Sequence, residues 1–428
     1  MRAEKISMAV STFTRMGTGM VIFILLARFL GPAPFGLIAT ATAYSTLLAL
    51  ISDYGLATYT LREAGAHRDT AARIVRLSLV AKMLTTLAAA VIGAGALLVM
   101  MPSPEVVLVS VVVFVGVMAA SFADQAFVIV RALGRFDVEA RNVVVTSAVS
   151  LVVLAGVAIV THEVVASALA FMGTRLFYLG ASLWRLRSWF DQQGERFRRD
   201  EIISILRSAS SYALDGMMTN LSNQIDVVMV SLMLDQTSIG IYQAGARLVQ
   251  SISPFAVILS TVYLPKLSER HRVGDEASFH KTARSLILEF CGLAAVFFLG
   301  FLIVGPLWTV HVYGENYRPL IPLWPAFASF VFVRFVVAAS SIQLIALGRI
   351  KDRLAITAIV IPINAGAIWV LLPRVGLSVV PTILSCSSLL PLYFFNWQLL
   401  REGHNRGMVA ATLFLSTGVV AVASFLSL

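Results

Sequence analysis

The sequence is poor in charged residues and nearly free of cysteine, and both shortages narrow what the chain can be. Only 13% of its 428 residues are charged, whereas 58% are hydrophobic, a composition that excludes an ordinary soluble domain. Its two cysteines, Cys291 and Cys386, lie within apolar runs, which argues against a disulfide framework. Metal-site spacings, phosphate-binding loops and nucleophile motifs are also missing. We therefore predict a membrane protein that is not an enzyme and carries no cofactor.

What the sequence has in abundance is apolar runs of about 20 residues, the length at which a helix crosses a bilayer. Thirteen such runs are predicted, at residues 6–30, 35–60, 77–101, 105–131, 142–161, 164–184, 205–234, 238–264, 285–309, 320–347, 354–373, 376–400 and 408–428. The predicted fold is an all-α polytopic membrane protein with twelve core transmembrane helices and a thirteenth at the C-terminus.

The basic residues indicate the orientation of these helices, because cytoplasmic loops are enriched in Lys and Arg. With the N-terminus in the cytoplasm, almost every basic loop residue falls on the cytoplasmic side, and only Arg318 and Arg374 fall on the other. The formal charge of +10 is thus spread over short loops at a membrane surface, which is not the distribution of a nucleic-acid-binding protein. We expect a multi-pass protein with a cytoplasmic N-terminus and no nucleic acid partner.

The two halves of the chain repeat each other weakly. A shift of 204 positions places Gly240 on Gly36, and the Ala-Leu-Gly-Arg of residues 132–135 recurs at 346–349. Each half has six predicted spans, so both begin on the same side and form parallel repeats with a substrate path expected between them. The predicted organisation is an N-terminal six-helix lobe at 1–184, a cytoplasmic linker at 185–204, a C-terminal six-helix lobe at 205–400, and an extra hydrophobic segment at 401–428.

One run, residues 207–234, carries a line of polar residues at helical spacing. Steps of three and four residues place them on one face of the helix; they are Ser208, Ser211, Asp215, Thr219, Ser222 and Asp226. From Ser211 to Asp226 this line rises about 22 Å, most of a hydrocarbon core of about 30 Å. A carboxylate at that depth is costly unless it faces water or a partner. We expect this helix, and its equivalent at 6–30, to line a central cavity.

Four arginines lie deep within predicted spans: Arg15, Arg175, Arg247 and Arg334. Arginine stays charged when desolvated, and its planar fork matches phosphate oxygens. These arginines, with Ser211, Thr219 and Ser222, are the predicted contacts for a phosphate-bearing substrate. The alternative is that arginines and aspartates pair between helices and only stabilise the bundle.

Three deep aspartates, Asp124, Asp215 and Asp226, are the predicted sites for a coupling H+ or Na+, with structural pairing again the alternative. Lys82 and Asp53 lie nearer the interface, where their charged ends could reach the headgroups, and we do not count them as site residues.

A cluster of aromatic residues lies toward the outer ends of the ninth and tenth spans. Trp308, Tyr313, Tyr317 and Trp324 suggest an interfacial belt, with stacking on a sugar as the alternative.

Three motifs resemble a known group of transporters. They are Ile-Ser-Asp-Tyr-Gly-Leu-Ala at 51–57, followed by Arg62; Gly-Ile-Tyr-Gln-Ala-Gly-Ala-Arg-Leu at 240–248; and Tyr-Gly-Glu-Asn-Tyr at 313–317. Over residues 1–400 the chain resembles oligosaccharide-lipid flippases of the multidrug/oligosaccharidyl-lipid/polysaccharide (MOP) exporter superfamily, in particular Wzx-like O-antigen and exopolysaccharide flippases.

The resemblance implies two six-helix lobes around a V-shaped cavity and transport by alternating access. The implied cargo is an undecaprenyl-diphosphate-linked oligosaccharide, moved from the cytoplasmic to the periplasmic leaflet of a bacterial inner membrane for O-antigen or exopolysaccharide biosynthesis. Membrane lipids, a polysaccharide polymerase and glycosyltransferases of the same pathway are the implied partners. Three alternatives stay open: an ion-coupled multidrug exporter, a lipid II flippase, and a membrane scaffold for polysaccharide assembly.

Overall fold

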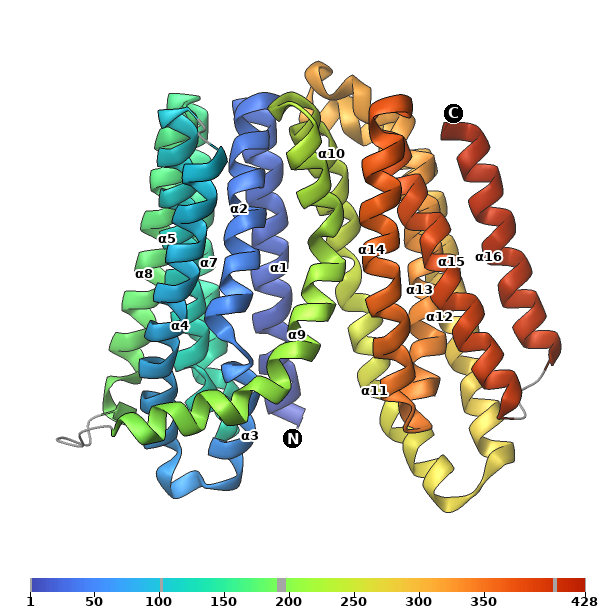
Figure 1. The fold of residues 1–428 in the computed structure, drawn as a ribbon, viewed down its shortest axis with the longest axis horizontal. Helices are drawn as coiled ribbons and strands as arrows, with labels where there is room; N and C mark the ends of the chain where they lie inside the picture. Colours follow the sequence, from blue (N-terminus) through green and yellow to red (C-terminus); the bar gives the residue numbers. More distant parts are fainter. Residues whose placement is uncertain (1, 101–102, 191–197, 403–405, 428) are drawn as a thin grey trace. The chain divides into compact units, whose positions relative to one another are not determined.

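The computed structural model describes residues 2–100, 103–190, 198–402 and 406–427, and within these ranges the chain is helical with no strand (Figure 1). It divides into two compact units, residues 1–224 and 225–428. The division falls inside one long helix, α9 (Arg199–Met233), so that α9 begins in unit 1 and ends in unit 2.

Unit 1 is built from six long helices and three short elements. The long helices are α1 (Arg2–Leu30), α2 (Pro32–Asp53), α4 (Ala71–Met100), α5 (Pro104–Ala126), α7 (Phe136–Thr161) and α8 (Val164–Phe190). The short elements are α3 (Leu56–Ala66), a 3₁₀ turn η1 (Arg68–Thr70) and α6 (Val128–Ala132). The most extensive packing joins α5 to α8, α1 to α7, α7 to α8, and α2 to both α4 and α5. Proline at the first position of α2 and α5 suits a helix start, because the missing N–H would have no partner there.

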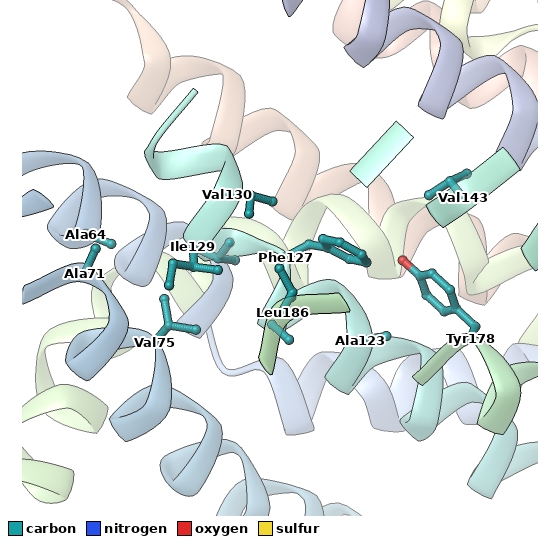
Figure 2. Close-up of a cluster of buried hydrophobic side chains, with 12 residues drawn as sticks. Ala64, Ala71, Val75, Ala123, Phe127, Ile129, Val130, Val143, Tyr178 and Leu186 are labelled. Atoms are coloured by element: carbon teal, nitrogen blue, oxygen red, sulfur yellow. The ribbon is translucent and has the colours of Figure 1, made fainter. Parts of the chain in front are cut away.

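A buried cluster in unit 1 packs the α5–α6 junction against α4, α7 and α8 (Figure 2). Phe127, Ile129 and Val130 from the α5–α6 junction pack against Val75 of α4 and Tyr178 of α8. The rings of Phe127 and Tyr178 stack with centroids 6.3 Å apart. This packing fixes the position of Tyr178, whose hydroxyl is used by the polar network described below.

Unit 2 is organised around α13 (Trp324–Ala346). Its other helices are α10 (Gln236–Ser251), α11 (Ser253–Val273), α12 (Glu276–Trp308), α14 (Ile350–Val375), α15 (Val379–Arg401) and α16 (Arg406–Ser427). Helix α13 packs most extensively against α11, α12, α15 and α16. A π turn η2 (Thr309–Tyr313) and a 3₁₀ segment η3 (Glu315–Leu323) connect α12 to α13. Asp235 caps α10 by accepting hydrogen bonds from the backbone N–H groups of Thr237 and Ser238.

Eleven helical stretches within the described residues are long and apolar enough to cross a membrane, which confirms the predicted all-α multi-pass class. Each of the thirteen predicted runs overlaps one or more helices in the described residues, although turn residues interrupt some of them, as at Tyr54 and Gly55. Two shorter apolar stretches are also found within the described residues, Gln224–Met233 in α9 and Val409–Ser424 in α16. The α16 helix packs against α13 and α15 and so belongs to unit 2.

Candidate functional site

Unit 1 contains a polar network centred on Arg15 of α1. Its Nη1 lies 2.6 Å from Oδ1 of Asp124 on α5, and its Nη2 donates to the hydroxyl of Tyr178 on α8 at 3.0 Å. The Tyr178 hydroxyl in turn donates to Oδ1 of Asp124 at 2.8 Å. Three helices thus converge on one carboxylate. The Arg15 and Asp124 side chains remain 35% and 38% exposed, so the network opens onto a surface of the protein.

The network continues through Glu139, which is 6% exposed and lies in the first turn of α7. Nη2 of Arg15 lies 3.4 Å from Oε1 of Glu139. Arg131 binds the same carboxylate with two hydrogen bonds, Nε to Oε2 at 2.8 Å and Nη2 to Oε1 at 2.6 Å. Glu139 therefore links a residue deep in α1 to the end of α6.

Arg175 of α8 gives the network an excess of positive charge. It interacts electrostatically with both Asp124 and Arg15, and its guanidinium lies over the ring of Phe171, 5.0 Å from the centroid. Among the described residues no carboxylate lies within ion-pair distance of it. Three arginines thus share two carboxylates, which leaves one positive charge for an external anion.

In unit 2 the carboxylate is Asp226 of α9, which is 8% exposed. It accepts a hydrogen bond from the hydroxyl of Tyr242 on α10, and it interacts electrostatically with Arg334 of α13 and Arg247 of α10. Nη1 of Arg247 also lies 3.5 Å from Oε1 of Gln250. Within the described residues, each unit thus places a deep aspartate against a tyrosine hydroxyl, with arginines nearby.

The remaining predicted residues are distributed along α9. Ser211 is exposed and Ser222 is half-buried, whereas the side chains of Asp215 and Thr219 lie outside the described part of the structure. Within unit 1 the structure brings Arg15, Asp124 and Arg175 together, and within unit 2 it groups Asp226 with Arg247 and Arg334.

Lys82 is enclosed within unit 1. It is 1% exposed, and its Nζ lies 3.0 Å from Oδ1 of Asp53. The packing of α2 on α4 encloses the lysine and supplies its counter-ion.

The aromatic cluster is mostly part of the core of unit 2. Tyr317 and Trp324 are fully buried. Trp324 stacks on Phe301 with centroids 5.5 Å apart, and its Nε1 donates to Oγ1 of Thr309 at 2.7 Å. Trp308, at 37% exposure, is placed as a belt residue would be. Burial of the others is inconsistent with a sugar-stacking surface and with an interfacial belt.

Sequence reasoning missed Tyr178, Glu139, Arg131 and Tyr242. Tyr178 lies one helical turn from Arg175, and Tyr242 lies in the motif at 240–248, so both carried a usable signal. Glu139 carried none, because it lies close to a loop with several basic residues. Among the described residues no group of three or more His, Cys, Asp or Glu side chains could hold a metal ion. The arrangement suits binding of an anion by arginine and exchange of a small cation at aspartate.

Comparison with known proteins places the chain in context. The sequence profile of a family described as "Polysaccharide biosynthesis protein" matches residues 2–271, and no curated protein matches the chain. Two solved structures are similar in fold. An inward-facing multidrug resistance MATE family transporter of the MOP superfamily has a TM-score of 0.67 at 15% identity, covering 96% of this chain and 98% of its own. Lipid II flippase MurJ, in an inward closed conformation, has a TM-score of 0.71 at 13% identity, with coverages of 97% and 91%.

Proposed function

Because the chain belongs to the polysaccharide biosynthesis protein family, we propose that it flips an undecaprenyl-diphosphate-linked oligosaccharide from the cytoplasmic to the periplasmic leaflet. Family membership and fold together make it a MOP-type flippase. The proposed setting is a bacterial inner membrane, with the N-terminus in the cytoplasm and O-antigen or exopolysaccharide as the end product. A polymerase and glycosyltransferases of the same pathway are the proposed partners.

The charge balance of unit 1 is the observation that supports a diphosphate cargo. A charged side chain within a bilayer is costly and persists where it is paired or used. Arg175 has an aromatic ring on one side and no carboxylate within ion-pair distance among the described residues. A diphosphate would supply the missing negative charge through paired N–H···O bonds. We assign Arg175 as the principal phosphate contact in unit 1, with Arg15 beside it.

In unit 2 the proposed contacts are Arg247 and Arg334, and along α9 they are Ser211, Thr219 and Ser222. Asp124, Asp215 and Asp226 are the proposed sites at which H+ or Na+ couples to transport.

The test compares two arginines of the same helix. Arg175→Gln should abolish surface polysaccharide in a deletion strain, whereas Arg187→Gln should not, although Arg187 also lies over a ring, that of Trp184, at 5.5 Å. Both variants must reach the membrane at wild-type level, as judged by immunoblot. Wild-type polymer in the Arg175→Gln strain would rule out the assigned phosphate contact.

A second pair of substitutions tests the function itself. Neutralising Arg247 and Arg334 together should also abolish surface polymer while the protein remains in the membrane. Normal polymer in that strain would argue against a lipid-diphosphate flippase and for a scaffold, since a scaffold has no use for buried charge.

A multidrug exporter is the second candidate, because MATE transporters share the fold. The charge balance of unit 1 disfavours a cationic drug, because three arginines, Arg15, Arg131 and Arg175, accompany the carboxylates of Asp124 and Glu139. Drug susceptibility of the deletion strain separates the two functions. The lipid II alternative has the same diphosphate chemistry, and a viable deletion strain with a normal cell wall would argue against it.

A further inference from the structure

The motif at residues 51–57 builds a sharp elbow between α2 and α3. After α2 ends at Asp53, Tyr54 and Gly55 adopt left-handed backbone conformations with φ of 44° and 75°, and α3 begins at Leu56. Helix α4 contacts this elbow through two side chains. Lys82 pairs with Asp53 at 3.0 Å, and the Thr85 hydroxyl donates to the backbone oxygen of Ser52.

Gly55 is the point at which the elbow meets α9. A Cβ built on Gly55 would lie 2.6 Å from the backbone oxygen of Ala209 and 2.6 Å from the backbone nitrogen of Ala213. Real side chains do not approach backbone atoms so closely, so only glycine allows this contact. Glycine is also the residue that adopts φ of 75° without strain. The close approach thus involves main chain on both sides.

Apolar side chains extend the contact around Gly55. Leu56 and Ala209 are fully buried, and they form one cluster with Leu77, Ala81 and Ile205. Figure 1 shows the first part of α9 lying across the end of unit 1 near α3, and the helix changing direction beyond this point. Residues 201–213, which we call the α9 arm, are therefore packed against α3 and α4.

Polar contacts hold both ends of the α9 arm. At its start, Nη2 of Arg73 lies 2.7 Å from Oε1 of Glu201. The Arg73 guanidinium lowers the pKa of Glu201 below its ordinary value, with a further contribution from the Arg198 backbone. At its end, the Arg62 guanidinium donates to the hydroxyl of Tyr212.

We infer that the elbow at residues 52–56 is a docking site that holds the α9 arm against α3 and α4. On this inference α9 bends during transport only beyond Ala213. Asp53, Gly55 and Lys82 are then positioning residues for the helix that carries Asp226 in unit 2. The sequence beyond the arm suits a joint, because Gly216 and Asn220 have low helix propensity.

Cross-linking tests whether the arm stays docked. Arg73→Cys and Glu201→Cys are introduced together with Cys291→Ser and Cys386→Ser, and a short, reducible bifunctional thiol reagent is added to membranes. We expect efficient cross-linking with transport within twofold of the unlinked protein. Transport that is lost on cross-linking and recovered on reduction would show that the arm leaves unit 1, and would overturn the inference. Failure to cross-link would overturn it as well.

A glycine series separates contact from backbone strain. Gly55→Ala should reduce the yield of the 73–201 cross-link at least fivefold and transport at least tenfold. Gly31→Ala shares a positive φ of 83° but has no neighbouring atom within 4 Å of the new Cβ, so it should retain the cross-link. Equal yields in the two variants would refute a role for the close contact. The cross-link yield requires no substrate, so it remains a valid test even if the proposed cargo is wrong.

A charge exchange serves as the rescue. Arg73→Glu alone should lower transport, and adding Glu201→Arg should restore at least half of it. Failure of the exchange to restore transport in a protein that reaches the membrane would count against the clamp.

Discussion

Loss of the Arg15 side chain should destabilise unit 1 by a measurable amount. In Arg15→Gln, Asp124 would lose its ion-pair partner and keep the hydrogen bond from the Tyr178 hydroxyl, whereas Glu139 would retain its two hydrogen bonds from Arg131. Breaking a fully buried pair by removing one partner costs about 3–5 kcal/mol. Because the two side chains are 35% and 38% exposed, screening by water reduces the expected cost to about 1–2 kcal/mol.

The assay is the temperature at which purified protein in detergent loses its monodisperse elution peak. For a unit of this size, about 1–2 kcal/mol corresponds to a fall of about 2–8 °C. Adding Asp124→Asn to Arg15→Gln removes the unpaired carboxylate, so the double variant should recover part of the loss. Arg175→Gln breaks no ion pair within the described residues, so this temperature should fall less in that variant. If Arg15→Gln elutes as the wild type does at every temperature, the proposed role of Arg15 in the network is incorrect. The same holds if Arg175→Gln lowers the temperature of peak loss as much as Arg15→Gln does.

Two further predictions concern contacts outside the network. Arg73 lowers the pKa of the Glu201 carboxylate in the folded protein. The ion pair therefore stabilises the fold fully at any pH above the ordinary pKa of glutamate, about 4.3. This stabilisation is lost only as the pH falls through the lower pKa of the folded state. The rate of proteolysis within the α9 arm should accordingly be constant from neutral pH down to about 5. A rise in that rate within this pH range would contradict the prediction. Separately, Gly305→Ala should lower the unfolding temperature, because the new Cβ would lie 2.7 Å from the Trp324 ring, while Gly300→Ala on the same helix, with nothing within 4 Å, should not.

The class and the places of the long helices could be predicted because each needs about 20 apolar residues, and that requirement is local in the sequence. Their ends were harder to predict. The second span was expected to continue to residue 60, but α2 ends at Asp53, since the left-handed Tyr54 and Gly55 interrupt it. At that break Gly55 lies against Ala209 of α9, which is distant in the sequence. Hydropathy alone contains no information about such a contact.

The candidate site was predictable in type but not in pairing. Depth within a span identified Arg15, Asp124 and Arg175, because charges in a bilayer are few and easily located. Depth could not indicate that Glu139, near a loop, would bind Arg15, since that contact depends on how α7 packs against α1. For the same reason depth did not indicate that Lys82 of α4 would pair with Asp53 of α2.

The weak repetition between the halves also limits what sequence comparison can locate. In unit 1 the arginine lies on the first helix, as Arg15, and the aspartate on α5, as Asp124. In unit 2 the aspartate lies on α9, as Asp226, and an arginine on α13, as Arg334. The shift of 204 positions superimposes Arg15 on Thr219, so aligning the halves would miss the second site. What each bundle requires in a bilayer is a carboxylate compensated by nearby cationic and hydrogen-bonding groups. Either of two packed helices can carry the carboxylate and the other the arginine. The charges of a bundle can therefore stay compensated while the positions of the charged residues differ between the two units.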